Sequence, residues 1–386
     1  MLRLEDIVLR EIRLPLREPF RISSGVVDQR RIGLLQMVDA DGVTAWSECV
    51  AGEYPNYSPE TIDTAWHAIV EWIAPRVLGR SFNDPREIFP VLERDFRGHL
   101  MAKAAVEMGA WVLAAERLGT SLANLLGGTR TEIATGISLG IQRSAETLVE
   151  KSRAALALGY RKVKIKIAPG MDVDYLGAVR QAVGATAPLM ADANNAYTPA
   201  DSDHLARLDG FDLMMIEQPF AFDDLVQHAQ LQRRLRTPIC LDESITSLDR
   251  VRDMVMLGSG RIVNIKPGRV GGFAASLAIH AFCEMKGIPV WCGGMLESGI
   301  GRACNVALAS LRNFTKPGDV SPSGRYWERD IVSPEWTMSA DGMVRVPFDR
   351  RGLGVDVDVA RVDDLTVRMV KLSAPRSRAS AEAVAG

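Results

Sequence analysis

Six charged residues recur through the middle of the chain at nearly constant spacing. After Lys164, the residues from Lys166 onward follow one another 24 to 26 positions apart, and each stands at or just after the end of a short apolar run. These runs read KVKIKI, LMADAN, LMMIEQP, PICLDES and IVNIKPG. One repeated structural unit would therefore bring together six side chains, namely Lys164, Lys166, Asp192, Glu217, Asp242 and Lys266.

The three carboxylates predict a site for a divalent cation. Asp192, Glu217 and Asp242 offer oxygen ligands only, and no His or Cys stands at an equivalent position. Oxygen ligation favours a hard cation, and Mg²⁺ is the first choice because it keeps waters and takes further ligands from its substrate. Mn²⁺ or another divalent cation could substitute. A plainer interpretation is that the carboxylates cap helices, but equal spacing on consecutive strands favours a shared site.

The lysines predict acid–base chemistry on carbon. Lys164 and Lys166 lie two residues apart, so on a strand they share a face, and we expect each to lower the pKa of the other. Lys266 follows a strand four units later and would approach from the opposite side of a barrel. Two such bases could remove a proton from one face of a planar intermediate and return it to the other face.

The chemistry that suits this set of charges is proton abstraction beside a carboxylate. Removing that proton gives a dianionic enediolate, which water stabilises poorly and which a cation with flanking ammonium groups stabilises well. Taken alone, KVKIKI would read as an ordinary amphipathic strand with solvated lysines. Its combination with Lys266 and the acidic triad favours a catalytic role.

The elements that would position these residues are parallel strands alternating with helices. Apolar runs covered on both faces are typical of such strands, and their carboxyl ends form the active-site rim of a barrel. Strands come first in the preceding segment, with a hairpin at Asp41-Gly42, then a helix capped by Ser58 with Pro59 at its first position, and helical residues 99–125. We expect an α+β capping domain over 1–125, a catalytic barrel over 126–325, and a segment 326–386 returning to the cap. This last segment would contain a hairpin at Asp341-Gly342 and a disordered tail from about residue 373.

Composition limits the class of protein. The chain has 386 residues, 46 basic and 48 acidic residues, and a formal net charge of -2, which gives no reason to expect nucleic acid or a membrane as partner. Five cysteines without a CxxC pair favour a reducing, cytoplasmic location. No apolar run approaches the length of a membrane span, and the first residues lack the apolar core of a signal peptide.

Several residues flank the predicted site. Asn194 and Glu243 follow proposed cation ligands and could orient ligands or lysines, although a role in local structure is an equal alternative. Ser138 ends the first barrel run. The glycine-rich stretch 268–272 follows a strand and could cradle a phosphate, but it lacks GxGxxG spacing, so a tight turn is favoured.

The motifs together resemble the enolase superfamily, specifically its muconate-lactonizing-enzyme subgroup. They include KIK at 164–166, DAN at 192–194, DES at 242–244, NIKPGRVGG at 264–272 and GGMLESGIGRA at 293–303. The resemblance implies a (β/α)7β TIM-like barrel with an α+β cap, Lys166 and Lys266 as acid–base groups, and Lys164 as an electrostatic aid. It also implies specificity loops at 19–25 and 49–57. The substrate contacts that it suggests are Tyr54, Tyr57, Gly293, Met295 and Glu297.

Within this subgroup the chain is most similar to the o-succinylbenzoate synthase and N-succinylamino acid racemase family. This likeness implies dehydration in menaquinone biosynthesis, racemisation, or both, on a small-molecule carboxylate, by a homo-oligomer. Muconate cycloisomerase remains an alternative. Dipeptide epimerases carry Asp-x-Asp after the last strand, whereas this chain has Asp319-Val320-Ser321. An inactivated barrel acting as a binding protein is disfavoured because all six site residues are present.

Overall fold

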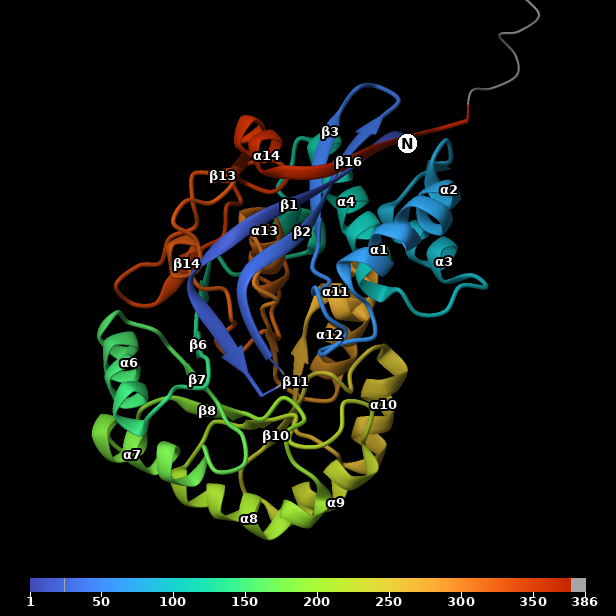
Figure 1. Cartoon of the computed structure of the whole chain (residues 1–386). Helices are drawn as coiled ribbons and strands as arrows, with labels where there is room; N and C mark the ends of the chain where they lie inside the picture. Colours follow the sequence, from blue (N-terminus) through green and yellow to red (C-terminus); the bar gives the residue numbers. More distant parts are fainter. Residues whose placement is uncertain (24, 376–386) are drawn as a thin grey trace, which may run out of the picture.

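An antiparallel sheet forms the upper part of the molecule in Figure 1. The computed structural model describes residues 1–23 and 25–375. The sheet has the order β16-β1-β2-β3, and β4 pairs with the start of β1. Its strands are β1 (Leu2–Ile22), β2 (Gly25–Asp39), β3 (Thr44–Cys49), β4 (Ser81–Phe82) and β16 (Thr366–Ser373). The hairpin expected at Asp41-Gly42 joins β2 to β3, with Gly42 at a φ of 81°.

Helices pack on one side of this sheet, and the first of them begins later than expected. Its N-cap is Thr61, which exchanges hydrogen bonds with Thr64, so the prediction of Ser58 as the cap is wrong. Ser58 Oγ instead accepts from the amide of Glu60 at 3.3 Å. The helices are α1 (Ile62–Ala68), α2 (Ala74–Val77), α3 (Ile88–Glu93), α4 (Leu100–Leu118) and α5 (Leu122–Leu126).

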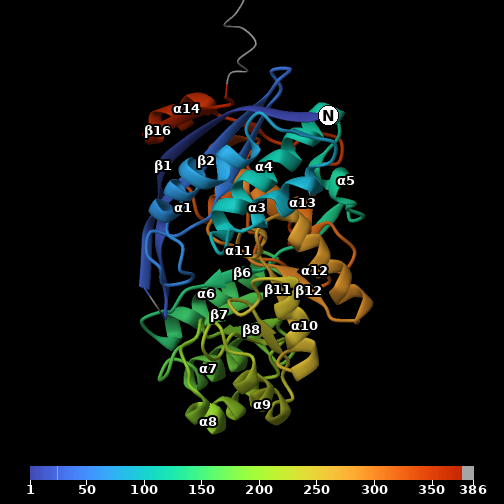
Figure 2. The same cartoon turned by 90° about the vertical axis from the view of Figure 1, so that its right-hand side faces the viewer.

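Helix α4 is the central element of the cap. It is buried along most of its length because it lies between the sheet and the barrel. Gly109 permits the close approach to the sheet. A Cβ atom at this position would lie 2.2 Å from Met37 Sδ and 2.9 Å from Ser47 Oγ. Figure 2 shows α4 running between the blue strands and the orange helices of the barrel.

The barrel contains seven paired parallel strands in sequential order. They are β6 (Ile137–Leu139), β7 (Val163–Lys166), β8 (Leu189–Asp192), β9 (Ile216–Glu217), β10 (Ile239–Leu241), β11 (Ile262–Ile265) and β12 (Val290–Cys292). Residues 316–319 close the gap between β12 and β6. The amide of Asp319 donates to Cys292 O at 2.8 Å, and the amide of Gly136 donates to Gly318 O at 2.7 Å. The predicted (β/α)7β architecture is confirmed.

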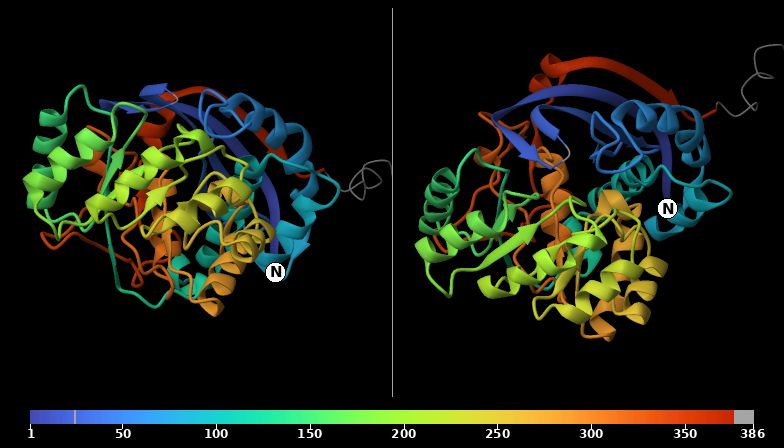
Figure 3. Two further views of the ribbon diagram at one scale, coloured as in Figure 1. Left: turned by 90° about the horizontal axis from the view of Figure 1, so that it is seen from below. Right: turned by 60° about the horizontal axis from the view of Figure 1, so that its bottom comes forward.

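Helices surround these strands, as Figure 3 shows from below. They are α6 (Ala145–Ala157), α7 (Val173–Val183), α8 (Ser202–Ala206), α9 (Val226–Arg234), α10 (Leu248–Leu257), α11 (Pro267–Val270), α12 (Phe273–Met285) and α13 (Gly299–Ala309). A separate apolar cluster of five buried residues fills the strand layer below the charged residues. It consists of Met190, Met215, Cys240, Ile262 and Trp291. Most of these residues precede a site residue by two positions, so strand alternation places them one layer deeper in the barrel.

The C-terminal segment takes a different course from the one expected. A tight turn forms at Asp341-Gly342, but β14 (Met343–Arg345) pairs with β5 (Glu132–Ala134), so the predicted hairpin is wrong. Strand β13 (Val332–Ser333) pairs with β15 (Asp356–Val357), and α14 (Val359–Leu365) leads into β16. Strand β16 then pairs antiparallel with β1. Ser373 is still paired in this strand, and the remaining predicted tail, 376–386, lies outside the described residues.

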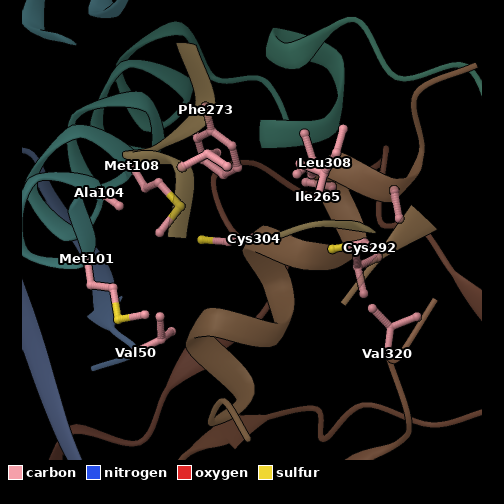
Figure 4. Close-up of a cluster of buried hydrophobic side chains, with 14 of the residues drawn as sticks. Val50, Met101, Ala104, Met108, Ile265, Phe273, Cys292, Cys304, Leu308 and Val320 are labelled. Atoms are coloured by element: carbon pink, nitrogen blue, oxygen red, sulfur yellow. The ribbon is translucent and has the colours of Figure 1, made fainter. Parts of the chain in front are cut away.

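One apolar core continues from the cap into the barrel. Figure 4 shows Met108 of α4 near Phe273 of α12 and Cys304 of α13, and Met101 of α4 beside Val50; all five are buried. Burial of such side chains is the main source of stability at this junction. In the described part of the chain, no helix has both the length and the apolar character needed to span a membrane.

Candidate active site

The strand register places the three carboxylates side by side. Asp192 ends β8 and is paired with Lys166 of β7 on one side and Glu217 of β9 on the other. Asp242 directly follows β10, and Lys266 directly follows β11. All five are buried at the carboxyl ends of their strands, at the barrel end that faces the cap. A separation of about 25 residues in sequence thus becomes a separation of one strand in space.

Lys164 occupies the centre of the acidic group. Its Nζ lies 2.8 Å from Asp192 Oδ2, 2.6 Å from Glu217 Oε2 and 3.2 Å from Asp319 Oδ2. The other oxygen of Glu217 accepts a hydrogen bond from Asn264 Nδ2 at 2.7 Å. These contacts hold the carboxylates in fixed orientations within the barrel.

Lys166 lies on one side of the carboxylates. Its Nζ donates to Asp192 Oδ2 at 2.6 Å and to Asn194 Oδ1 at 2.5 Å. The amide nitrogen of Asn194 in turn donates to Glu243 Oε1 at 3.1 Å, and Asn195 does so at 3.2 Å. Asn194 therefore connects Lys166 to Glu243 through hydrogen bonds, and a role of this pair in orienting the lysine stays a prediction.

Lys266 lies on the other side of the carboxylates. Its Nζ donates to Asp242 Oδ2 at 2.8 Å and to the hydroxyl oxygen of Tyr57 at 3.1 Å. That hydroxyl donates to Asp242 Oδ1 at 3.0 Å, and Arg269 pairs closely with the same oxygen. Tyr57 comes from the cap, so this cluster joins the cap loop to the barrel floor.

The carboxylates of the site control the pKa values of its lysines. Burial favours a neutral Lys164, but Asp192, Asp319 and Glu217 outweigh it and raise the pKa of Lys164 well above its ordinary value. Burial likewise opposes the charge on Lys266, whose pKa Asp242 nevertheless raises. Carboxylates therefore dominate the pKa of Lys164, and the lowering expected between ammonium groups near a divalent cation stays a prediction.

The pKa values of Asp192 and Glu217 are shifted in opposite directions by their surroundings. Burial would raise the pKa of Asp192, but Lys164 and Lys166 hold it well below its usual range. Burial raises the pKa of Glu217 to about 8, and the Asp192 charge adds to this effect. Among Asp192, Glu217 and Asp242, Glu217 is thus the carboxylate whose ionised form the protein itself compensates least.

The donor set of this group fits a divalent cation. Across the described residues, no three His, Cys, Asp or Glu side chains already converge in a cation-holding arrangement, because lysine nitrogens lie between the oxygens. Glu243 Oε2 is buried without a hydrogen bond, and Glu217 Oε2 has none beyond its ion pair with Lys164 at 2.6 Å. Adjacent carboxylates with incompletely satisfied oxygens suit a hard cation.

A cavity of about 470 Å³ lies between the cap and this floor. Its lower lining includes Lys166, Asn194 and Lys266. Its sides come from residues of the two segments expected to set specificity, 19–25 and 49–57, and from Gly294, Met295 and Leu296. Gly293 lies directly beneath. A Cβ atom there would be 2.4 Å from Asn264 Oδ1 and 2.6 Å from Lys266 Cε, so glycine keeps space for the lysine chain.

The other residues that the sequence analysis singled out differ in how close they lie to the cavity. Tyr54 lines the outer part of the cavity and is 69% exposed. Ser138 is buried beside Lys164 in the strand register, and its hydroxyl has no hydrogen bond. Glu297 lies outside the cavity lining and accepts from the Met295 amide at 2.7 Å and from Asn305 at 2.9 Å. It therefore supports the loop at 293–296.

Sequence reasoning missed Arg269, Asn264 and Asp319. The stretch 268–272 is not the simple tight turn that was favoured, because residues 268–270 belong to α11, which is followed by its C-cap Gly271 with a φ of 98°. Arg269 lies on that short helix, three residues after Lys266, and this helical spacing was the available signal. Asn264 precedes Lys266 by two residues and shares its strand face. Asp319 was noted only in the comparison with Asp-x-Asp, and no spacing rule linked it to Lys164, since only closure of the barrel brings the two together.

The class of protein follows from the fold, the site and the comparison with family models. Residues 5–127 match the mandelate racemase / muconate lactonizing enzyme N-terminal domain, and residues 147–362 match the enolase C-terminal domain-like model. The chain belongs to the mandelate racemase / muconate lactonizing enzyme family of the enolase superfamily, whose members use a divalent metal ion, typically Mg²⁺. The predicted superfamily and the predicted enzymatic role are confirmed.

Individual relatives narrow the comparison. The chain is 48% identical over 365 residues to o-succinylbenzoate synthase of Geobacillus kaustophilus, covering 95% of this chain and 96% of the relative. It is 46% identical to N-succinylamino acid racemase of Thermus thermophilus, covering 97% and 100% of the two chains. An enolase-superfamily crystal structure from Listeria innocua, 38% identical, superposes with a TM-score of 0.93 over 97% of this chain and 100% of that chain.

Proposed function

We propose that this enzyme removes the proton α to a carboxylate, as an o-succinylbenzoate synthase, an N-succinylamino acid racemase, or both. The observation that carries the proposal is the position of Lys166 and Lys266 on opposite sides of three carboxylates at the floor of one cavity. A substrate carbon held between them would be within reach of a base on either face.

Cation binding and proton transfer are assigned to different residues of the site. Asp192, Glu217 and Asp242 would hold Mg²⁺, with Mn²⁺ as a substitute. The bound cation would neutralise the substrate carboxylate and draw these oxygens away from the lysines, which favours neutral lysine. Lys166 or Lys266 takes the α-proton, and Lys164 faces the charge that develops on the substrate. In racemisation the opposite lysine returns a proton. In dehydration a single lysine starts the reaction by taking the α-proton.

The identity of the relatives favours this pair of reactions over the alternatives. The synthases and racemases cited above are 46–48% identical to the chain, whereas a muconate lactonizing enzyme structure from Pseudomonas fluorescens is 23% identical and supports the fold alone. Ser321 also argues against a dipeptide epimerase, because it stands where the second aspartate of Asp-x-Asp would be. Asp319 is held by lysines, since its carboxylate faces Lys162 at 3.0 Å and Lys164 at 3.2 Å inside the barrel.

Three broader features belong to the same proposal. We treat 1–125 with the C-terminal segment as the cap and 126–325 as the catalytic barrel, supported by the pairing of β16 with β1. The five cysteines are buried and free, which supports a reducing, cytoplasmic compartment. A homo-oligomer is expected, and light scattering of the purified protein measures this directly.

The direct test is incubation in deuterated water with Mg²⁺. N-succinyl amino acids, dipeptides and the o-succinylbenzoate precursor would each be followed for α-deuterium incorporation, inversion and dehydration. The expected result is exchange of N-succinyl amino acids, dehydration of the precursor, or both. Exchange of dipeptides alone, or no turnover of any substrate, would reject the proposal.

A further inference from the structure

A second charged feature of the cavity lies on the cap. Arg30 and Arg31 are adjacent in β2, and both line the cavity above the lysines. Strand alternation sends them to different surroundings. Arg30 is 5% exposed and lacks an acidic partner within the described part of the chain, whereas the Arg31 side chain pairs with buried Glu11 and exposed Asp63. Their partners differ in charge as well as position.

Arg31 is already neutralised. Its guanidinium lies 2.7 Å from Glu11 Oε1 and 2.9 Å from Asp63 Oδ1, and these hydrogen bonds raise its pKa. A substrate anion would have to displace one of these carboxylates. Arg31 is therefore poorly suited to recruit a charged ligand, although it borders the same cavity.

Arg30 has no such partner among the described residues. Its Nη2 donates to the carbonyl oxygens of Val50 at 3.1 Å and Ala51 at 3.5 Å, while its buried Nε has no hydrogen bond. No carboxylate of the described chain lies within ion-pair distance. A buried guanidinium with unused donors and no counter-charge is costly, and it binds a carboxylate strongly.

The acidic residues around Arg30 do not pair with it. Glu48 accepts from Ser298 Oγ at 2.6 Å and from the Gly301 amide at 3.0 Å, at the start of α13. Glu297 is held by Met295 and Asn305, and Glu53 is half exposed at the surface. These groups moderate the potential around Arg30, and burial still lowers its pKa.

The compounds named for the relatives carry a negative group that could pair with Arg30. An o-succinylbenzoate product and an N-succinylamino acid both contain a succinyl group, whose free end is a second carboxylate. The first carboxylate of such a substrate belongs at the barrel floor, beside the cation ligands. The second must then lie farther up the cavity, toward the cap.

We infer that Arg30 binds the distal carboxylate of the substrate's succinyl group and so selects dianionic acyl substrates. This inference rests on the proposed function and adds a specificity residue to it. Arg30 would act on recognition and would leave the proton transfer to the lysines. The energy of the contact should therefore affect KM more than kcat.

The test compares two substrates of the same shape. N-succinylphenylalanine and N-succinamoylphenylalanine differ only in a terminal carboxylate or carboxamide, and α-deuterium exchange reports on both. The unmodified enzyme should prefer the succinyl compound. Arg30→Gln should lower kcat/KM for that compound by about 30-fold or more, mostly through KM, as expected for losing a buried charged hydrogen bond. The succinamoyl compound should change by less than about threefold, and Arg30→Lys should keep part of the preference.

Arg31→Gln is the matched control, because it removes the neighbouring cavity arginine whose charge is already paired. It should alter both substrates by the same factor and keep the preference. An equal loss of both substrates in Arg30→Gln would assign Arg30 a structural role and overturn the inference. Equal kcat/KM values in the unmodified enzyme would overturn it without any variant. Exchange of neither compound by the unmodified enzyme, together with no dehydration of the o-succinylbenzoate precursor, would instead reject the proposed function.

Discussion

Lys166 and Lys266 stand in mirrored positions relative to the carboxylates. Each ammonium group donates to the Oδ2 atom of an aspartate on the adjacent strand, Lys166 to Asp192 at 2.6 Å and Lys266 to Asp242 at 2.8 Å. The two aspartates flank Glu217, so the lysines enclose the whole acidic group. This arrangement gives the site two faces with equivalent chemistry and fixed positions.

The two faces can be separated by mutation. Lys166→Ala should abolish dehydration and racemisation, because one proton-abstracting group is lost, with kcat falling by about 10²-fold or more. Lys266→Ala should stop α-proton exchange from one enantiomer of a racemase substrate. Deuterium incorporation into each separate enantiomer measures both effects. Equal exchange from the two enantiomers in Lys266→Ala would contradict the two-base scheme.

Asp242→Asn should weaken divalent-cation binding strongly. The amide keeps the size of the side chain but removes the negative charge that a hard cation requires. Mn²⁺ titration followed by electron paramagnetic resonance measures this without any turnover. Asp224→Asn is a useful control, since Asp224 precedes α9 and accepts from the Gln227 amide at 3.0 Å, away from the carboxylate group. A titration curve unchanged by Asp242→Asn would remove Asp242 from the ligand set.

Gly109→Ala should destabilise the protein despite the better helix propensity of alanine. The added Cβ would lie 2.2 Å from Met37 Sδ, and overpacking of this kind costs about 1–3 kcal/mol. Gly177→Ala in α7 is the matched control, because its Cβ would lie 3.5 Å from Phe211, an ordinary contact. That change should stabilise by up to about 1 kcal/mol. Denaturant unfolding of both variants distinguishes these signs, and a more stable Gly109→Ala would refute the packing argument.

Glu107 should make stability depend on pH in the neutral range. Burial raises its pKa to about 7, against hydrogen bonds from the Ala274 and Phe273 amides that favour the charged form. A carboxyl whose folded pKa exceeds its unfolded value, about 4.3, keeps a proton that the unfolded chain has lost. Its contribution therefore declines as pH rises from about 4.3 to 7.

Glu107→Gln removes this titration while preserving the size of the side chain. The free energy of unfolding of the variant, relative to the unmodified protein, should rise between pH 5 and pH 8. Denaturant melts at several pH values measure the difference. A difference independent of pH would show that Glu107 titrates normally.

Much of the site could be predicted from one sequence because its residues obey a strand rule. Asp192, Glu217 and Asp242 follow apolar runs at nearly equal spacing, and parallel strands carry such positions to one rim. The alternation of side chains also explains why Lys164 and Lys166 share a face. Local patterns were less reliable at element ends, where Thr61 replaced Ser58 as the helix cap.

The pairing of Arg31 and the isolation of Arg30 were decided only by tertiary structure. The two arginines are neighbours in sequence, but Glu11 and Asp63 reach only one of them. The direction of the lysine pKa shifts also depends on the tertiary structure, because it is set by how many carboxylates surround each nitrogen. Spacing along the chain determines which residues reach a common rim. Distances in three dimensions determine which charges are compensated, since electrostatic energy depends on separation and burial.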